Sequence, residues 1–183
     1  MNSPCTPYTD AMSLPRNHGL LLVVSGPSGG GKTTIVHRIR GRLGGRFSVS
    51  ATTRPRGEDE VDGVDYLFVS TEQFDAMKQA GEFLEDAEVF GRHAYGTPRM
   101  PVAQVLAQGD LIMLDIDVQG AIQVRDRMPA AFMLFILPPS DAELRHRLET
   151  RGREDEEAIN RRFSEARREI DLATSRVLYD AFI

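Results

Sequence analysis

The chain has 183 residues, of which 41% are hydrophobic and 27% are charged, a composition typical of one folded domain with a sizeable core. Its formal net charge of −5 argues against a general nucleic-acid-binding surface, and no apolar run approaches the roughly 18 residues of a membrane span. A single cysteine, Cys5, excludes an internal disulfide and a cysteine metal cluster. We therefore expect a cytoplasmic protein with no nucleic-acid partner and no membrane partner.

The chain divides into a loose tail and an α/β domain. Residues 1–19 hold three prolines and no apolar stretch typical of a signal peptide. From residue 20 onward, apolar runs alternate with helical patterns, which predicts a mostly parallel sheet covered on both faces. Strands are predicted at 20–25, 66–69, 111–115 and 132–137. Helices are predicted after residue 33 up to Gly44, from a capping box of Ser70 and Gln73 to Gly81, and from about 101 to 108. Two more are predicted, one from a cap of Ser140 and Glu143 to about 152, and one with an apolar stripe over 158–170. The polar stretch 48–65 is not expected to form a core element.

Residues 26–33 read Gly-Pro-Ser-Gly-Gly-Gly-Lys-Thr, which matches the phosphate-binding pattern G-x-x-x-x-G-K-[ST]. Glycines let successive backbone N–H groups point inward at phosphate oxygens. Lys32 offers a mobile cation for the β- and γ-phosphates, and Thr33 offers a hydroxyl to Mg²⁺. The alternative is a glycine-rich turn that merely ends a buried strand. The strand before the loop and the helix after it favour a nucleoside triphosphate site.

Two further features suit phosphate chemistry. The apolar run 111–115 ends in Asp115, at the edge of the sheet where α/β proteins bind ligands, so this carboxylate is predicted to reach the metal held by Thr33. The alternative is an aspartate that only caps the next turn. Eight arginines lie between 145 and 168, and guanidinium groups stabilise a phosphoryl group in transfer. Because glutamates are interspersed among them, most are predicted to form a solvated surface, and three or four to face the phosphates.

If the acceptor of the phosphoryl group is itself a phosphate, the site needs no strong base. The sequence shows no serine, cysteine or histidine placed beside a base, and a phosphate oxygen needs none because its second pKa is about 6. Arg54, Arg56 and Tyr66 are suited to hold such a phosphate. The carboxylates Glu85 and Asp117 suit the adjacent N1–H and N2 amino donors of guanine.

Seven segments of the chain resemble the guanylate kinase family. The most specific are Thr-Thr-Arg within 48–54 and Leu-Asp-Ile-Asp-Val-Gln-Gly at 114–120. The others are 25–33, 62–66, 81–85, 95–97 and 147–152, so the resemblance covers most of the chain from Leu20 onward. It implies transfer of the γ-phosphoryl group of ATP to GMP or dGMP, giving ADP and GDP in purine metabolism, with Mg²⁺.

The resemblance also implies residue roles. ATP is expected to contact Gly26, Pro27, Ser28, Gly29, Gly30, Gly31, Lys32, Thr33 and Thr34, and the residues expected to act in catalysis are Lys32, Arg147, Arg151 and Arg162. Guanine is expected to be read by Ser50, Glu85 and Thr97, with Asp117 nearby. The GMP phosphate is expected to contact Arg54, Arg56, Tyr66 and Tyr95, and the metal to lie near Thr33 and Asp115.

The fold implied by the resemblance is of the P-loop NTPase type, with a parallel five-stranded sheet flanked by helices. Its core is expected at about 20–48, 100–139 and 171–183, with a GMP-binding insertion at about 49–99 and a small helical lid at about 140–170. Two departures stand out. Arg56 arrives one residue earlier than in the family pattern, and the chain ends at Ile183 where relatives continue into a final helix, so we expect the working protein to be longer.

Two other functions stay open. One is a guanylate-kinase-like module that binds phosphorylated peptides, against which the intact Lys32, Thr33 and Asp115 count. The other is a ribose-phosphate kinase of the same fold, against which Ser50, Glu85 and Thr97 count. The sequence does not distinguish a monomer from a homo-oligomer.

Overall fold

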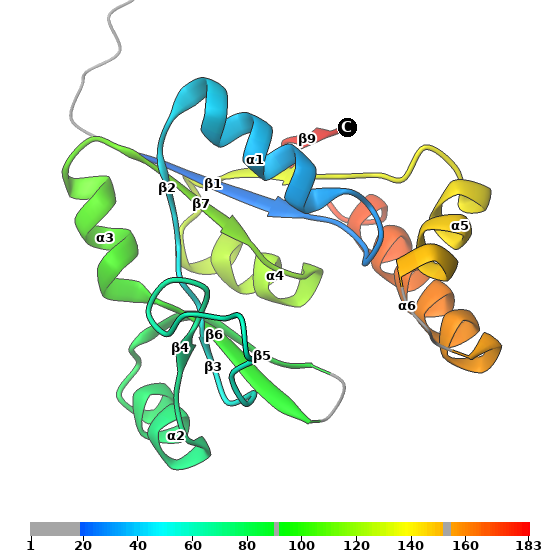
Figure 1. The fold of residues 1–183 in the computed structure, drawn as a ribbon. Coiled ribbons are helices and arrows are strands. Elements are labelled where there is room, and N and C mark those ends of the chain that lie inside the picture. The colour runs from blue at the N-terminus through cyan, green and yellow to red at the C-terminus, as the bar shows by residue number, and fades with distance from the viewer. Residues whose placement is uncertain (1–18, 90–91, 152–154) are drawn as a thin grey trace, which may run out of the picture.

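The computed structural model describes residues 19–89, 92–151 and 155–183, and its centre is a five-stranded parallel sheet (Figure 1). The strand order is β2-β7-β1-β8-β9. These strands are β1 (Leu20–Ser25), β2 (Arg46–Phe47), β7 (Leu111–Asp115), β8 (Phe132–Phe135) and β9 (Ala181–Phe182). All four neighbouring pairs run parallel, which confirms the predicted α/β fold with a parallel five-stranded sheet.

Helices cover both faces of this sheet, because alternate side chains of a strand point to opposite sides. Leu21 and Val23 of β1 pack into a core that includes α3 (Arg99–Ala107), α4 (Val118–Arg127) and the end of α6 (Glu156–Thr174). Leu22 and Val24 pack on the other face, beneath α1 (Lys32–Leu43). Burial on both faces explains why the central strands read as continuous apolar runs.

A second sheet of four strands, in the order β4-β3-β6-β5, lies below the parallel sheet, where the chain continues from β2 into β3 (Figure 1). Its strands are β3 (Ala51–Thr52), β4 (Leu67–Phe68), β5 (Phe83–Val89) and β6 (His93–Pro98), and α2 (Thr71–Gln79) packs on it through Phe74, which stacks on Phe83 at 4.5 Å between ring centroids. The predicted capping box of Ser70 and Gln73 begins α2.

The expectation that the polar stretch 48–65 forms no core element is wrong. Ala51 and Thr52 of β3 are fully buried in the second sheet. The Thr52 hydroxyl meets the cost of burial by donating a hydrogen bond of 3.0 Å to the carbonyl of Ala94. A two-residue strand in a polar segment is too short to show a period of two.

Helices α5 (Asp141–Arg151) and α6 form a third unit beside the sheet (Figure 1). Leu144 and Leu148 of α5 pack against Ile159 and Ala166 of α6, which confirms the apolar stripe predicted over 158–170. The predicted Ser140 cap of α5 is also present, since its hydroxyl accepts a hydrogen bond of 3.1 Å from the Glu143 N–H. Within the described ranges, no helix combines the length and hydropathy needed to cross a membrane.

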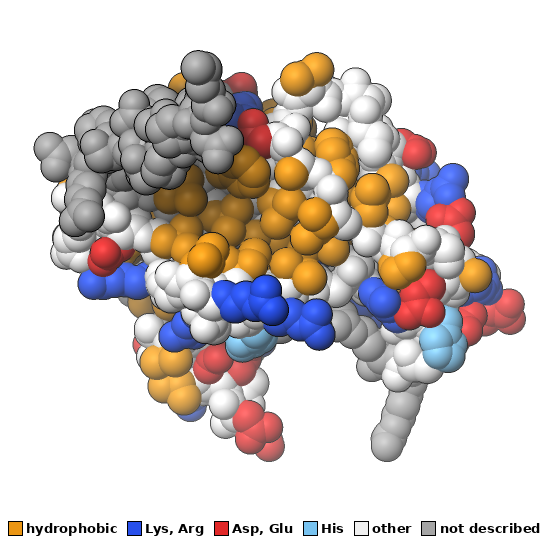
Figure 2. Space-filling view, turned by 90° about the horizontal axis from the view of Figure 1, so that it is seen from above, with side chains coloured by type: hydrophobic (Ala, Val, Ile, Leu, Met, Phe, Trp, Pro, Cys, Tyr) orange, Lys and Arg blue, Asp and Glu red, His pale blue; other side chains and the backbone are white. Residues whose placement is uncertain are grey.

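The face of the sheet on the α1 side is only partly covered. Figure 2 shows a broad field of hydrophobic side chains on the face seen from above. By strand alternation, Leu20, Phe132 and Ile183 share this face with the buried Leu22 and Leu134, and all three are at least 43% exposed.

Candidate active site

The glycine-rich loop connects the end of β1 to the start of α1. Gly29 and Gly31 have φ angles of 84° and 103°, a left-handed conformation that disfavours any residue with a side chain. Gly31 is also the N-cap of α1 and provides no side-chain cap, so the first N–H groups of the helix are open to a ligand. A helix start of this kind favours an anion such as phosphate.

Lys32 lies within the curve of the loop. Its ammonium group donates hydrogen bonds to the carbonyls of Gly26 at 2.6 Å and Pro27 at 3.2 Å. Asp115 ends β7 beside it, in register with Val24 of β1. Burial raises the pKa of Asp115, and the nearby charge of Lys32 opposes that rise. The predicted cation and the predicted metal-side carboxylate therefore lie at one edge of the sheet.

Two of the described arginines of α5 and α6 reach the loop. Arg162 donates to the Ser28 hydroxyl at 2.8 Å, and Nη1 of Arg147 lies 3.4 Å from the carbonyls of both Gly29 and Gly30. Arg147 also pairs with Glu143 at 2.6 Å, while Arg145 and Arg167 pair with Glu149 and Asp141 on the surface. Some arginines of the cluster therefore face the phosphate loop, and others form ion pairs on the surface. The side chains of Thr33 and Arg151, and the whole of Arg153, lie outside the described residues.

A cavity of about 480 Å³ adjoins the loop. The predicted ATP residues Gly29, Gly30, Gly31 and Thr34 line it, together with Arg147, which was predicted to act in catalysis. Sequence reasoning missed the rest of its wall, which includes apolar residues just after β8 and residues of α1 and α5 that no motif sets apart. Those residues are Ile35, Ile136, Leu137, Pro139, Thr150 and Ile183.

A second cavity, of about 330 Å³, lies between the two sheets. Six predicted residues line it: Ser50, Tyr66, Glu85, Tyr95, Asp115 and Asp117. Sequence reasoning missed the other four, Phe47, Asp65, Ala87 and Ile116. Asp115 lines this cavity and interacts electrostatically with Lys32, so the cavity and the phosphate loop lie at the same edge of the parallel sheet.

Glu85 is the buried carboxylate of the second cavity, with only 4% of its surface exposed. Burial raises its pKa to about 7, although the Thr97 hydroxyl donates to Oε1 at 2.6 Å and favours the ionised form. Thr97 is itself fully buried behind the carboxylate. The backbone of Gly120 passes so close that a Cβ there would lie 2.6 Å from Oε2 of Glu85. Asp117 fixes this part of α4 by accepting a hydrogen bond of 2.7 Å from the Gly120 N–H.

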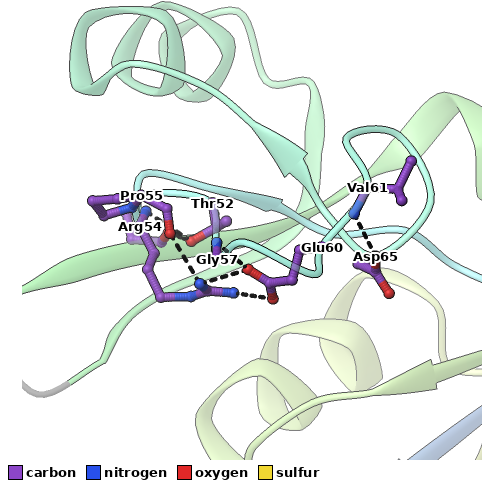
Figure 3. A network of polar contacts seen from close by, with 8 residues as sticks. Thr52, Arg54, Pro55, Gly57, Glu60, Val61 and Asp65 are labelled. Carbon is purple, nitrogen blue, oxygen red and sulfur yellow. Dashed lines mark hydrogen bonds and ion pairs between the residues drawn. The ribbon is translucent and has the colours of Figure 1, made fainter.

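Arg54 lies at the tyrosine side of the same cavity. Its guanidinium carbon is 5.3 Å from the ring centroid of Tyr66, and the Tyr66 and Tyr95 rings are 5.9 Å apart. Figure 3 shows the Arg54 guanidinium paired with Glu60. The sequence analysis missed Glu60, because it is one of several acidic residues in this stretch and no motif distinguishes it. Arg56 is exposed and does not belong to the described lining, so its phosphate contact stays a prediction.

The fold and the two cavities define the class of protein. A parallel sheet, a glycine-rich loop with its lysine, and a carboxylate on the neighbouring strand are the parts of a P-loop nucleotide-binding protein. Comparison with known proteins then gives the family, since residues 18–183 match the family model described as guanylate kinase.

Individual relatives agree. A guanylate kinase of Thermosynechococcus vestitus is 54% identical over 156 residues, which are 85% of this chain and 81% of that protein. One of Gloeobacter violaceus is 48% identical over 169 residues, or 91% and 82% of the two chains. The crystal structure of guanylate kinase from Anaplasma phagocytophilum superimposes with a TM-score of 0.70 at 35% identity, covering 91% of this chain and 77% of that one. The chain belongs to the guanylate kinase family.

Proposed function

We propose that the chain transfers the γ-phosphoryl group of ATP to GMP, and to dGMP, giving ADP and GDP. The observation that carries this proposal is the buried pair of Glu85 and Thr97 in a cavity at the same edge of the parallel sheet as the phosphate loop. A buried carboxylate is suited to accept hydrogen bonds from the N1–H and N2 amino groups of guanine. Adenine presents no such pair of donors, which favours GMP over AMP.

The donor half of the reaction is proposed to rest on Lys32, Arg147 and Arg162. With ATP in the loop, the Lys32 ammonium exchanges the carbonyls of Gly26 and Pro27 for phosphate oxygens. Arg147 and Arg162 already lie against the loop, where their positive charge stabilises the negative charge on the transferring phosphoryl group. Arg151 and Thr34 are proposed to contribute to the same half, by position in the family pattern.

The acceptor half is proposed to hold both ends of GMP. Ser50, Glu85 and Thr97 read the guanine, with Asp117 at the α4 side, while Arg54, Tyr66 and Tyr95 hold the phosphate. An anionic phosphate oxygen attacks directly, so the site needs no general base. The ring-reading residues distinguish this proposal from a ribose-phosphate kinase, and the phosphate loop distinguishes it from a phosphopeptide-binding module.

The residues present fit Mg²⁺ bound together with ATP. Among the described residues, no cluster of three or more His, Cys, Asp or Glu side chains forms a metal cage. Mg²⁺ bound through one carboxylate and the substrate phosphates needs no cage, and Asp115 supplies that carboxylate beside Lys32. Asp115 and Thr33 are the residues that would hold it. When bound, the ion neutralises phosphate charge during transfer.

We also propose that residues at about 49–99 and 140–170 close over the core when both substrates are bound. The α5–α6 pair lies beside the phosphate loop and the second sheet lies below the parallel sheet, and each has a small core of its own. Closure would exclude water, which otherwise competes as phosphoryl acceptor.

The direct test is ³¹P NMR of a mixture of Mg-ATP, GMP and the chain. We expect ADP and GDP to appear in equal amounts. ADP and inorganic phosphate without GDP would mean that water is the acceptor, and would contradict the proposal.

A further inference from the structure

We propose that Glu60 is a positioning residue of the acceptor site, holding the Arg54 guanidinium in the orientation that receives the phosphate of the acceptor nucleotide. The inference rests on the function proposed above, because it concerns the same site. It adds a residue to which neither the sequence patterns nor the residue roles implied by the family assign any part.

The contact between the two side chains is a two-pronged fork (Figure 3). Nη2 of Arg54 donates to Oε1 of Glu60 at 2.6 Å, and Nη1 donates to Oε2 at 2.9 Å. Nη1 also donates to the carbonyl of Pro55 at 2.9 Å. Forks of this type fix the plane of the guanidinium as well as its position.

The fork uses only one edge of the guanidinium. Arginine carries five N–H donors, and the bonds to Glu60 and Pro55 engage both hydrogens of Nη1 and one of Nη2. Nε–H and the second Nη2–H lie along the adjacent edge, which has the spacing to bind two phosphate oxygens. Tyr66, whose ring lies under the guanidinium, and Tyr95, whose ring centroid is 5.9 Å from that of Tyr66, both line the cavity, so the guanidinium borders the space proposed for the acceptor.

Glu60 is itself fixed, as a positioning group must be. Its Oε2 accepts a hydrogen bond of 2.7 Å from the Gly57 N–H, and its own N–H donates to the Gly57 carbonyl at 3.3 Å. Arg54 is tied to the sheet, because its N–H donates to the hydroxyl of the buried Thr52 at 3.1 Å. Both partners of the fork are therefore held before any ligand arrives, which lowers the ordering cost of binding.

The alternative role for Glu60 is that of a competitor, in which its carboxylate occupies the place of the GMP phosphate on Arg54. The two roles differ in sign. Removing a competitor strengthens GMP binding, whereas removing a positioning residue weakens it. The edge of the guanidinium that Glu60 and Pro55 leave open favours positioning, since one arginine then serves carboxylate and phosphate together.

The test compares Glu60→Ala, Glu60→Gln and the control Glu58→Gln, which removes an exposed acidic charge from the same loop. For Glu60→Ala we expect the KM for GMP to rise by about tenfold or more, as for a lost charge-assisted fork. Glu60→Gln keeps one acceptor oxygen, so its KM for GMP should lie between those of Glu60→Ala and the unaltered chain. The KM for ATP, the kcat, and the inhibition constant of guanosine, which has no phosphate, should stay within about twofold in all three variants.

A double-mutant cycle excludes a purely structural effect. In an Arg54→Ala background, Glu60→Ala should leave the KM for GMP unchanged, because the group that it positions is gone. A tighter KM for GMP, an equal loss of guanosine binding, or a loss that persists without Arg54 would overturn the positioning role. Absence of GMP turnover in the unaltered chain would instead overturn the proposed function, and the positioning role with it.

Discussion

At the scale of single residues, the site depends on charged groups held away from water. Lys32 curls onto two loop carbonyls, and Glu85 lines the second cavity as a buried carboxylate with one hydroxyl donor. Both arrangements suit ligands that bring compensating groups, an anionic phosphate in one case and ring N–H donors in the other.

Replacing Lys32 by Ala should reduce kcat by about 10²–10³-fold, because the ammonium stabilises charge that develops during transfer. Folding should be almost unaffected, since the residue bonds only to loop carbonyls. Steady-state kinetics and thermal unfolding measure the two effects. Arg38→Ala, at an exposed position of α1, is the matched control, and turnover of Lys32→Ala close to that of this control would refute the loop assignment.

Glu85 should make GMP recognition dependent on pH. Its pKa is raised to about 7, so the ionised acceptor of the guanine N–H groups is lost as the pH falls below 7, and the KM for GMP should rise. Burial is the main cause of the raised pKa, and the negative charges of Asp117 and Asp86 raise it further. Because the phosphate of GMP titrates with a second pKa of about 6, the reference is Glu85→Gln, which should bind GMP weakly and lose the Glu85 part of the pH profile. ATP binding should be spared, and equal losses for GMP and ATP would count against this role.

At the scale of elements, helix α4 packs against the Glu85 carboxylate through Gly120. Gly120→Ala should favour the helix by about 1 kcal/mol in intrinsic propensity, yet its Cβ would meet Oε2 of Glu85 at 2.6 Å. We therefore expect weaker GMP binding with unchanged ATP binding. Gly41→Ala in α1, where a Cβ would meet nothing within 4 Å, should raise stability without changing either KM. Unchanged GMP binding in Gly120→Ala would show that Glu85 moves freely.

The elements also show what could be predicted from sequence. The strands at 20–25 and 111–115 and the two serine caps were predictable, since long apolar runs and capping side chains are local signals. The two-residue strands β2, β3 and β9 carry no periodicity, and only their partners in the sheets define them. At the site, Glu85 and Tyr95 were predictable by resemblance. Glu60 and Ile116 were not, because their roles depend on contacts that local sequence does not encode.

At the scale of the whole molecule, stability should depend on the two-sided core rather than on the apolar face in Figure 2. Met133 and Phe132 are neighbours on β8, with exposures of 0% and 43%. Met133→Ala should lower the free energy of unfolding by about 2–5 kcal/mol, and Phe132→Ala by clearly less despite its larger side chain. Urea unfolding of both variants gives the comparison. Similar losses would mean that the exposed face is buried in the protein as it exists in solution.

The central claim is that the phosphate loop and the Glu85 cavity together make a kinase for guanine nucleotides. The most direct measurement is ADP release from Mg-ATP with GMP, dGMP, AMP, CMP, UMP and a ribose phosphate offered one at a time. We expect fast turnover with GMP, slower turnover with dGMP, and a kcat/KM for each of the others lower by at least about 10³-fold, as when a buried acceptor loses its donors. Comparable turnover with AMP, or turnover with only the ribose phosphate, would contradict the assignment of the Glu85 cavity to guanine.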